Sequence, residues 1–333
     1  MELLRVDNLS TDFRLRIGKV QAVRGISFHV DEGESVGIVG ESGSGKSVSM
    51  MSVMRLLPDT AATRADHILF DGEDLLAKSE KEMRKIRGDR ISMVFQDPMT
   101  SLNPLFTIGE QIMEPIRIHR KVTKAEARAR ALEMLKKVQI PSPESRLNEY
   151  PHELSGGMRQ RVMIAIATCC NPKLLIADEP TTALDVTIQA QILELMNQLK
   201  QELHTSIIII THDMGVVANM CSRVLVMYGG MILEEGAARE IFYQPRHPYT
   251  VGLIRSVPRV GRNREKLRSI PGNPPDLFAP PAGCPFVPRC PYAMRICEKQ
   301  MPPRFELSPT HKVCCWLLHP GAPKTGEGAQ ANG

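Results

Sequence analysis

Short apolar runs alternate with segments of helical periodicity along most of the chain. The apolar runs predict buried β-strands at residues 35–39, 67–70, 91–95, 173–177 and 206–210, and from residue 223. Helical periodicity occurs at about residues 46–57, 187–203 and 213–220. Strands that alternate with helices are typical of an α/β fold with a largely parallel sheet and helices on both faces.

Three segments depart from this alternation. Apolar and polar residues alternate up to residue 30, which predicts a short antiparallel sheet in the first thirty residues. Residues from about 105 to 170 contain several helical patterns and no clear strand, so we expect a helical insertion there. Residues 224–234, interrupted by a Gly-Gly pair, predict a final hairpin.

The composition changes near residue 260. Thirteen of the 25 prolines fall between Pro271 and Pro323, and proline disfavours long helices and interior strands. We therefore divide the chain into a large α/β domain (residues 1–258), a small Pro- and Cys-rich C-terminal domain (259–322) and a disordered tail (323–333).

Charge and hydropathy limit the possible classes of protein. The net charge of +5 is spread over 333 residues. The densest basic run, residues 117–137, predicts a solvated helix face, so a nucleic-acid partner is not indicated. The N-terminus lacks a signal-peptide pattern, and the apolar runs are far shorter than the roughly 20 residues that cross a bilayer. We expect a cytosolic chain that meets a membrane only through a partner.

The clearest chemical motif is the octapeptide GESGSGKS, which fits the phosphate-loop pattern G-x-x-x-x-G-K-[ST]. A predicted strand precedes it and a predicted helix follows, as such a loop requires. Its backbone N–H groups would cradle phosphates, its lysine would reach the β- and γ-phosphates of ATP, and its final serine would ligate Mg²⁺. The residues that we assign to this ATP-binding loop are Gly40, Ser42, Gly43, Ser44, Gly45, Lys46 and Ser47.

Two adjacent carboxylates, Asp178 and Glu179, end the apolar run at residues 173–177. Charges at the end of a buried strand are costly unless a cation or a reaction uses them. We predict that Asp178 holds Mg²⁺ and that Glu179 polarises the attacking water as general base. The alternative is a helix N-cap with an acidic first turn, which the presence of Lys46 makes the less favoured interpretation.

Three further polar residues fit the same site. Gln96 follows the strand at residues 91–95 and would reach Mg²⁺ or the water. His212 follows a run of four isoleucines and would hydrogen-bond the γ-phosphate, and Asp185 lies in the loop after Glu179. A lone His or Gln after a strand is usually structural. Their placement at strand ends, where open α/β sheets bind ligands, favours the functional interpretation.

A second predicted phosphate contact is the turn Ser155-Gly156-Gly157, because a glycine pair that opens a helix presents N–H groups to an anion. Together with the phosphate loop and the paired carboxylates, it gives the chain a resemblance to ATP-binding-cassette (ABC) ATPases over about residues 3–255. The resemblance implies that Phe13 stacks on adenine, with a core role as the alternative. It also implies that two cassettes pair head to tail, so that this turn contacts ATP held by the partner.

Longer runs resemble the ATPase subunits of bacterial oligopeptide and dipeptide importers. They include QDPMTSLNP (96–104), and IPGNPP (270–275) followed by CPFVPRCPYAMRIC (284–297). Met158 stands where many cassettes carry glutamine, and this branch often has methionine there. The resemblance implies a second ATPase subunit, usually a different chain, two membrane permease subunits that contact residues 98–104, and an extracellular solute-binding protein. It implies a location at the cytoplasmic face of the membrane.

Five of the eight cysteines lie in the last fifth of the chain. In a reducing cytosol such a cluster favours metal binding over disulfides, and the spacing leaves zinc and iron–sulfur open, with unligated cysteines as a less favoured alternative. The importer ATPases carry a similar set, associated in some members with a [4Fe–4S] cluster. This resemblance favours such a cluster, with Zn²⁺ as the alternative, on Cys284, Cys290, Cys297 and Cys314 rather than Cys315.

We weigh three functions. The favoured one is the ATP-hydrolysing subunit of an importer of di- and oligopeptides, or of another small solute. A soluble cassette ATPase that acts on nucleic acid or ribosomes is disfavoured, since the chain lacks a second cassette and a concentrated basic patch. A regulatory protein that binds ATP without turnover is disfavoured by the presence of Lys46, Glu179 and His212.

Overall fold

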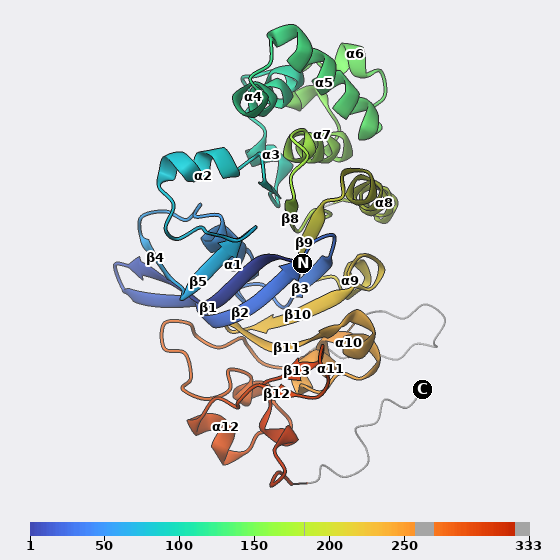
Figure 1. Cartoon of the computed structure of the whole chain (residues 1–333). Coiled ribbons are helices and arrows are strands. Elements are labelled where there is room, and N and C mark those ends of the chain that lie inside the picture. Colours follow the sequence, from blue (N-terminus) through green and yellow to red (C-terminus); the bar gives the residue numbers. More distant parts are fainter. Residues whose placement is uncertain (183, 257–269, 324–333) are drawn as a thin grey trace.

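The computed structural model describes residues 1–182, 184–256 and 270–323, and it contains two β-sheets with helices around them (Figure 1). The larger sheet has the strand order β12-β13-β11-β10-β3-β9-β8-β7. Its strands are β3 (Ser35–Val39), β7 (Ile91–Val94), β8 (Leu174–Asp178), β9 (Ser206–Thr211), β10 (Arg223–Tyr228), β11 (Met231–Ala237), β12 (Phe305–Glu306) and β13 (Lys312–Val313). The pairs from β10 to β7 are parallel, and the pairs from β10 to β12 are antiparallel.

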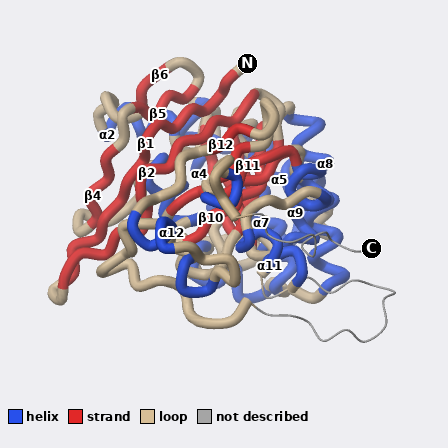
Figure 2. The backbone as a smooth tube through the Cα atoms, turned by 90° about the horizontal axis from the view of Figure 1, so that it is seen from below, coloured by secondary structure: helices blue, strands red, loops and turns tan. Residues whose placement is uncertain are grey.

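The smaller sheet is antiparallel and is formed near the N-terminus. It has the order β2-β1-β5-β6, with β4 also on β1. Its strands are β1 (Glu2–Leu15), β2 (Gly18–Asp31), β4 (Ala61–Arg64), β5 (His67–Phe70) and β6 (Glu73–Asp74). Figure 2 shows these strands running together, with α8 and α9 on the other side of the molecule.

A group of helices projects from the strand region, above β8 in Figure 1. It comprises α3 (Pro98–Ser101), α4 (Ile108–Arg120), α5 (Lys124–Lys137), α6 (Pro143–Arg146), η1 (Pro151–Glu153) and α7 (Gly156–Thr168). The other helices are α1 (Lys46–Val53), α2 (Glu80–Ile86), α8 (Val186–Leu203), α9 (Met214–Met220), α10 (Ala238–Tyr243), α11 (Pro248–Arg255), η2 (Val287–Arg289), α12 (Arg295–Lys299) and η3 (Trp316–Leu318). The predicted α/β class, antiparallel sheet and helical insertion are therefore confirmed.

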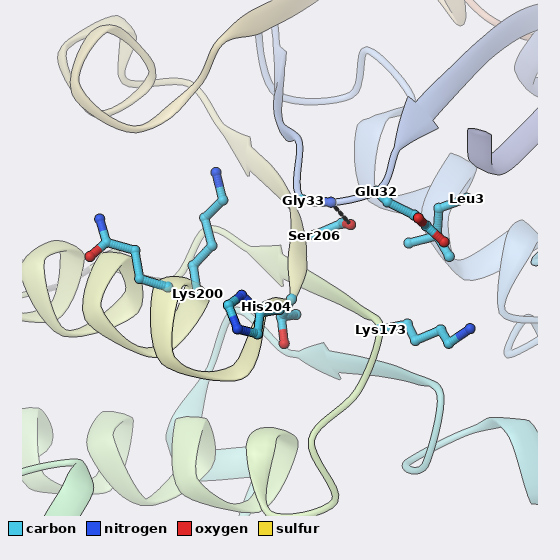
Figure 3. A pocket seen from close by; sticks show the side chains of 9 residues that line it. Leu3, Glu32, Gly33, Lys173, Lys200, His204 and Ser206 are labelled. Atoms are coloured by element: carbon cyan, nitrogen blue, oxygen red, sulfur yellow. Dashed lines mark hydrogen bonds between the residues drawn. The ribbon is translucent and has the colours of Figure 1, made fainter. Parts of the chain in front are cut away.

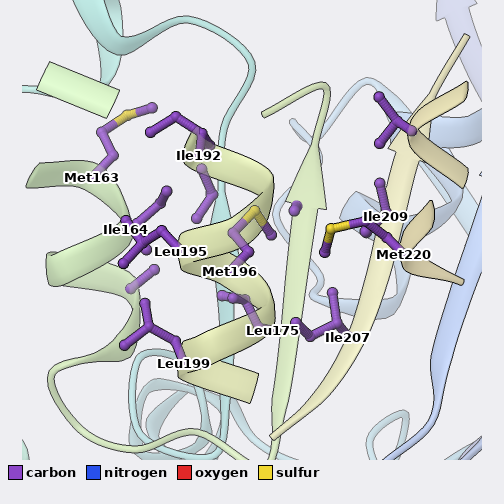
Figure 4. Packing of buried hydrophobic residues seen from close by; sticks show 14 of the residues in the cluster. Met163, Ile164, Leu175, Ile192, Leu195, Met196, Leu199, Ile207, Ile209 and Met220 are labelled. Carbon is purple, nitrogen blue, oxygen red and sulfur yellow. The ribbon is translucent and has the colours of Figure 1, made fainter. Parts of the chain in front are cut away.

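The parallel strands are buried on both faces, which is why they are continuous apolar runs. In β9, Ile207 and Ile209 face one hydrophobic cluster, whereas Ile208 and Ile210 face the other. Figure 4 shows the first cluster, in which α8 covers β8 and β9. The apolar positions of α8 recur at the i, i+3, i+4, i+7 spacing of one helix face: Ile192, Leu195, Met196 and Leu199.

The structure differs from the predicted elements in two places. Helix α1 ends at Val53 instead of residue 57, because Arg55 has a left-handed φ of 52° that a helix cannot continue through. The predicted hairpin forms as β10 and β11, but it is not the last pairing. Strand β13 adds to β11 through the pairs Glu234–Val313 and Glu235–Lys312, so the proline-rich region extends the main sheet.

Residues 324–333, most of the predicted tail, lie outside the described residues, as do residues 257–269 around the predicted domain boundary. Among the described helices, none is both long and apolar enough to cross a membrane.

Candidate nucleotide site

The loop between β3 and α1 has a shape that only glycine permits at two positions. Gly40 and Gly45 have φ angles of 155° and 98°. A Cβ atom on Gly40 would lie 2.1 Å from the Met227 carbonyl oxygen, and one on Gly45 would lie 2.4 Å from that of Ala22. The backbone therefore curls as a phosphate cradle requires. Ser42 and Gly43 are exposed on its outer side, and Ser44 is buried.

Lys46 begins α1 and is buried at the centre of this loop. Its Nζ donates to the carbonyl oxygens of Gly40 at 2.8 Å and Glu41 at 3.0 Å. Burial lowers the pKa of Lys46, and the nearby charges of Glu179, Asp178 and Glu41 oppose that shift. A buried ammonium held in a glycine-rich loop before a helix is suited to bind phosphate oxygens.

Ser47 and Asp178 meet next to the loop, although they are 131 residues apart in the chain. The Ser47 Oγ donates to the Asp178 Oδ1 at 2.8 Å. The pKa of the Asp178 carboxyl is raised, mainly by burial and in smaller part by the charge of Glu179. The hydrogen bond from Ser47 and the charge of Lys46 oppose this shift. A hydroxyl beside one carboxylate fits Mg²⁺, which takes few protein ligands and keeps waters and phosphate oxygens for its other positions.

Glu179 is held by three side chains, of which Gln96 and His212 follow the neighbouring strands β7 and β9 and Thr182 lies in its own loop after β8. Gln96 Nε2 donates to Oε2 at 2.9 Å, and Thr182 Oγ1 donates to the same oxygen at 2.8 Å. His212 Nδ1 lies 3.2 Å from Oε1. The left-handed φ of 45° at Glu179 is unusual for a non-glycine residue and turns the chain sharply at the strand end. The structure thus brings Gln96, Glu179 and His212 together.

Thr182 is a contact that sequence reasoning did not assign. A threonine three residues after the paired carboxylates was the available signal, but its hydroxyl could equally have faced solvent.

The Ser155-Gly156-Gly157 turn stands apart from the phosphate loop. Ser155 caps α7, accepting from the Met158 N–H at 3.3 Å, and Asp185 caps α8, accepting from the Ile188 N–H at 2.9 Å. These two helix starts touch, since a Cβ on Gly157 would lie 2.9 Å from Ile188 Cγ2. Within the described residues, no hydrogen bond or ion pair joins this turn to the group around Lys46.

Phe13 lies half-buried on β1, opposite Val20 of β2 and Ala61 of β4.

The cysteines of the C-terminal region fall into two environments. The pKa of Cys284 and of Cys315 is raised to about 12, mainly by burial and in smaller part by the charges that neighbouring cysteines, including Cys290 and Cys297, would carry. Burial raises the pKa of Cys314 to about 11, and the charges that act on this thiol are those of Arg304 and Glu235 instead of other cysteines. Among the described residues, no three His, Cys, Asp or Glu side chains are arranged to hold a metal.

A cavity of about 470 Å³ lies at the amino ends of the parallel strands, opposite the end that carries the phosphate loop (Figure 3). Its lining includes Lys173, Lys200 and Ser206, at or near the amino ends of β8 and β9 and the end of α8. Because ligands of open α/β sheets bind at the carboxyl ends of the strands, this cavity is not the nucleotide site.

Comparison with known proteins identifies the chain. Residues 23–182 match the ABC transporter family model, and residues 233–297 match that of the oligopeptide/dipeptide transporter C-terminal region. The chain is 57% identical over 324 residues to the oligopeptide transport ATP-binding protein OppD of Bacillus subtilis, across 97% of this chain and 90% of that protein. The chain belongs to the ABC transporter family, in its oligopeptide/dipeptide importer branch.

Other relatives agree with this assignment. This ABC ATPase is 54% identical over 317 residues to the dipeptide transport ATP-binding protein DppD of Bacillus subtilis, across 95% of each chain. A solved dimeric ATP-binding cassette, MJ0796, in a post-hydrolysis state bound to ADP and Pi, superposes with a TM-score of 0.64 at 31% identity. The superposition covers 71% of this chain and 99% of that one.

Proposed function

We propose that this ABC ATPase drives the uptake of dipeptides or oligopeptides through membrane permease subunits. The observation that carries the proposal is the placing of a buried lysine in the phosphate loop beside a hydroxyl–carboxylate pair, Ser47 and Asp178, with the carboxylate of Glu179 positioned at the carboxyl ends of β7, β8 and β9. The match of residues 233–297 to the peptide-transporter C-terminal region supports peptides over other solutes and over nucleic acid or ribosomes.

Each residue of the group has a role in hydrolysis. ATP supplies the phosphoanhydride bond, and Mg²⁺ would neutralise charge on its phosphates. Lys46 would hold the β- and γ-phosphates, and Ser47 and Asp178 would hold the metal, with Gln96 in reach of it. Glu179 would accept a proton from the attacking water. Thr182, Gln96 and His212 orient its carboxylate, and His212 would also contact the γ-phosphate.

A second cassette would complete the site. Ser155 and Gly156 are exposed at the start of α7, where free N–H groups favour an anion. Among the described residues, no hydrogen bond or ion pair links this turn to Lys46 of the same chain. We therefore assign the turn, together with Asp185 at the start of α8, to ATP held by a partner. The dimeric cassette MJ0796 has a similar fold. Phe13 would stack on adenine of this chain's own ATP.

Exposed apolar side chains support docking to a permease at the cytoplasmic face of the membrane. Met99, Leu105 and Phe106 are 64%, 80% and 51% exposed. They follow Gln96 directly in the chain and lie on or beside α3, which packs on α7. Motion at the nucleotide would thus pass to this surface over a few residues. An extracellular solute-binding protein would deliver the peptide.

The test is ATP-dependent uptake of a labelled tripeptide into proteoliposomes that contain the chain, its second ATPase and both permeases. We expect uptake with wild-type protein. Leu105→Asp is expected to lower uptake more than tenfold, because a charge would replace an apolar contact at the centre of the interface. ATP binding by the isolated variant should stay within twofold of wild type. Uptake of a non-peptide solute in place of every peptide tried would contradict the substrate class.

We further propose that residues 1–258 and 259–322 act as a nucleotide-binding and a C-terminal domain, and that Cys315 replaces Cys314 in the cysteine cluster. Cys315 has an extended backbone (φ −144°, ψ 126°), and neighbouring side chains of extended chain face opposite sides. Only one of the two can therefore face Cys290 and Cys297. The thiols fit iron–sulfur or zinc by ligand type, but their described arrangement does not form a metal site.

The two adjacent cysteines provide a matched pair of variants. If the purified chain binds metal, Cys315→Ser is expected to remove most of it and Cys314→Ser to retain it, because Cys290 and Cys297 neighbour Cys315 rather than Cys314. Iron, acid-labile sulfide and zinc are measured in both variants. Loss of metal in Cys314→Ser with retention in Cys315→Ser would restore Cys314 as the ligand. Wild-type protein with stoichiometric zinc and no iron would exclude the iron–sulfur cluster.

A further inference from the structure

An arginine of the C-terminal region reaches into the phosphate loop. Arg289 ends η2, and its Nη1 and Nη2 donate to the two carboxylate oxygens of Glu41 at 2.6 and 3.0 Å. Glu41 is the first residue after Gly40 of the loop. The Arg289 side chain is 4% exposed. A two-point, shielded arginine–carboxylate pair fixes both distance and orientation.

The remaining donors of Arg289 are also used. Nε donates to the Pro271 carbonyl at 2.8 Å, Nη2 to that of Ile270 at 2.9 Å, and Nη1 to the Tyr228 hydroxyl at 3.1 Å. The chain that continues from Pro271 lies along the outer side of the phosphate loop, where Pro274 and Leu277 line a small gap with Ser42, Gly43 and other residues. Arg289 therefore ties this segment and the loop into one unit.

Glu41 is held at its main chain as well. Its N–H donates to the Tyr249 hydroxyl at 2.9 Å, and its carbonyl oxygen accepts from Lys46 Nζ at 3.0 Å. The residue that Arg289 holds by the side chain thus also contacts the ammonium that we assign to the phosphates. A shift of Glu41 would move the Lys46 ammonium and the N–H groups of the cradle together.

We propose that Arg289 is a positioning residue for the ATP site. By holding Glu41, it keeps the phosphate loop in its binding conformation, so that the C-terminal region sets the affinity of this chain for ATP. The inference rests on the proposed function in that the loop binds ATP. The turn that carries Arg289 is itself packed in the core: Phe286 stands edge-on to Tyr228, with ring centres 5.4 Å apart, and lies as close to Tyr249.

The experiment measures the dissociation constant of Mg-ATP for the full chain by calorimetry. We expect Glu41→Gln to raise this dissociation constant about tenfold. The apparent affinity for Mg-ATP falls in proportion to the fraction of molecules whose phosphate loop is in the binding conformation. This variant leaves the bonds of Arg289 to Pro271 and Ile270 in place, so the C-terminal region stays folded. Arg289→Ala is expected to have a similar effect, and the double variant no larger one, because coupled residues are not additive.

Two readouts separate positioning from a general structural role. In the assembled complex, Glu41→Gln should raise the KM for ATP about tenfold and change kcat less than threefold, because saturating ATP restores the loop. Arg239→Ala, which removes an exposed arginine on α10, should leave both constants unchanged.

Wild-type affinity in Glu41→Gln would overturn the proposal, even if Arg289→Ala bound ATP weakly, because Arg289 would then act only by supporting its own region. Additive losses in the double variant would also overturn it. A wild-type chain that failed to bind Mg-ATP would instead overturn the proposed function on which the inference rests.

Discussion

Glu179→Gln is expected to lower ATP turnover of the assembled complex at least about a hundredfold, the range of a lost general base. The amide keeps the size of the side chain and its contacts with Gln96 and Thr182, but it cannot accept the proton of the attacking water. ATP binding should therefore persist, because Lys46, Ser47 and Asp178 are unchanged. Turnover is measured as phosphate release, and binding as the affinity of the isolated chain for Mg-ATP.

The control for this prediction is Glu194→Gln on α8, which changes an exposed glutamate far along the helix from its start. It should leave turnover within twofold of wild type. If Glu179→Gln retained full turnover, a different group would have to accept the proton, and His212, 3.2 Å from the same carboxylate, would be the next to change.

Ser155→Arg is expected to reduce turnover in the complex by about a hundredfold or more, comparable to the loss of a donor group from a charge-stabilising site. The long cation would occupy the space in front of the first turn of α7, where the partner's ATP would bind. The isolated variant should bind Mg-ATP with the wild-type constant, since among the described residues the Ser155 side chain bonds only the start of its own helix.

A matched variant at the far end of the same helix is Thr168→Ser, which keeps the hydroxyl that donates to the Ile164 carbonyl at 2.7 Å. Turnover should be unchanged in that variant. A large loss of ATP affinity in isolated Ser155→Arg would show that the turn serves this chain's own nucleotide, and so would contradict head-to-tail pairing.

Much of the fold and of the nucleotide site follows from contiguous patterns. The four isoleucines of β9 are buried on both faces, so they predict a central strand without knowledge of its neighbours. The phosphate loop is predicted because its glycines, lysine and serine are adjacent in sequence. Gln96, Glu179 and His212 were predictable as a group because parallel strands end at one edge, so that residues after different strands meet.

The contacts of the C-terminal region were not predictable in the same way. Arg289 and Glu41 are 248 residues apart, and nothing in CPFVPRC or GESGSGKS indicates that they pair. Strand β13 has only two residues, too few for a periodic pattern, and it forms because β11 offers an open edge. The family resemblance favoured Cys314, whereas in the structure the charges of Cys290 and Cys297 act on Cys315 and those of Arg304 and Glu235 act on Cys314.

The sequence by itself determined which chemistry this protein has, because phosphate and metal binding need particular residues at short, fixed spacings. Only the tertiary structure decided what holds that chemistry in place. The partners of Glu41 and Glu179, and the division of the cysteines, depend on where distant segments pack, and packing is set by many weak contacts rather than by any local motif.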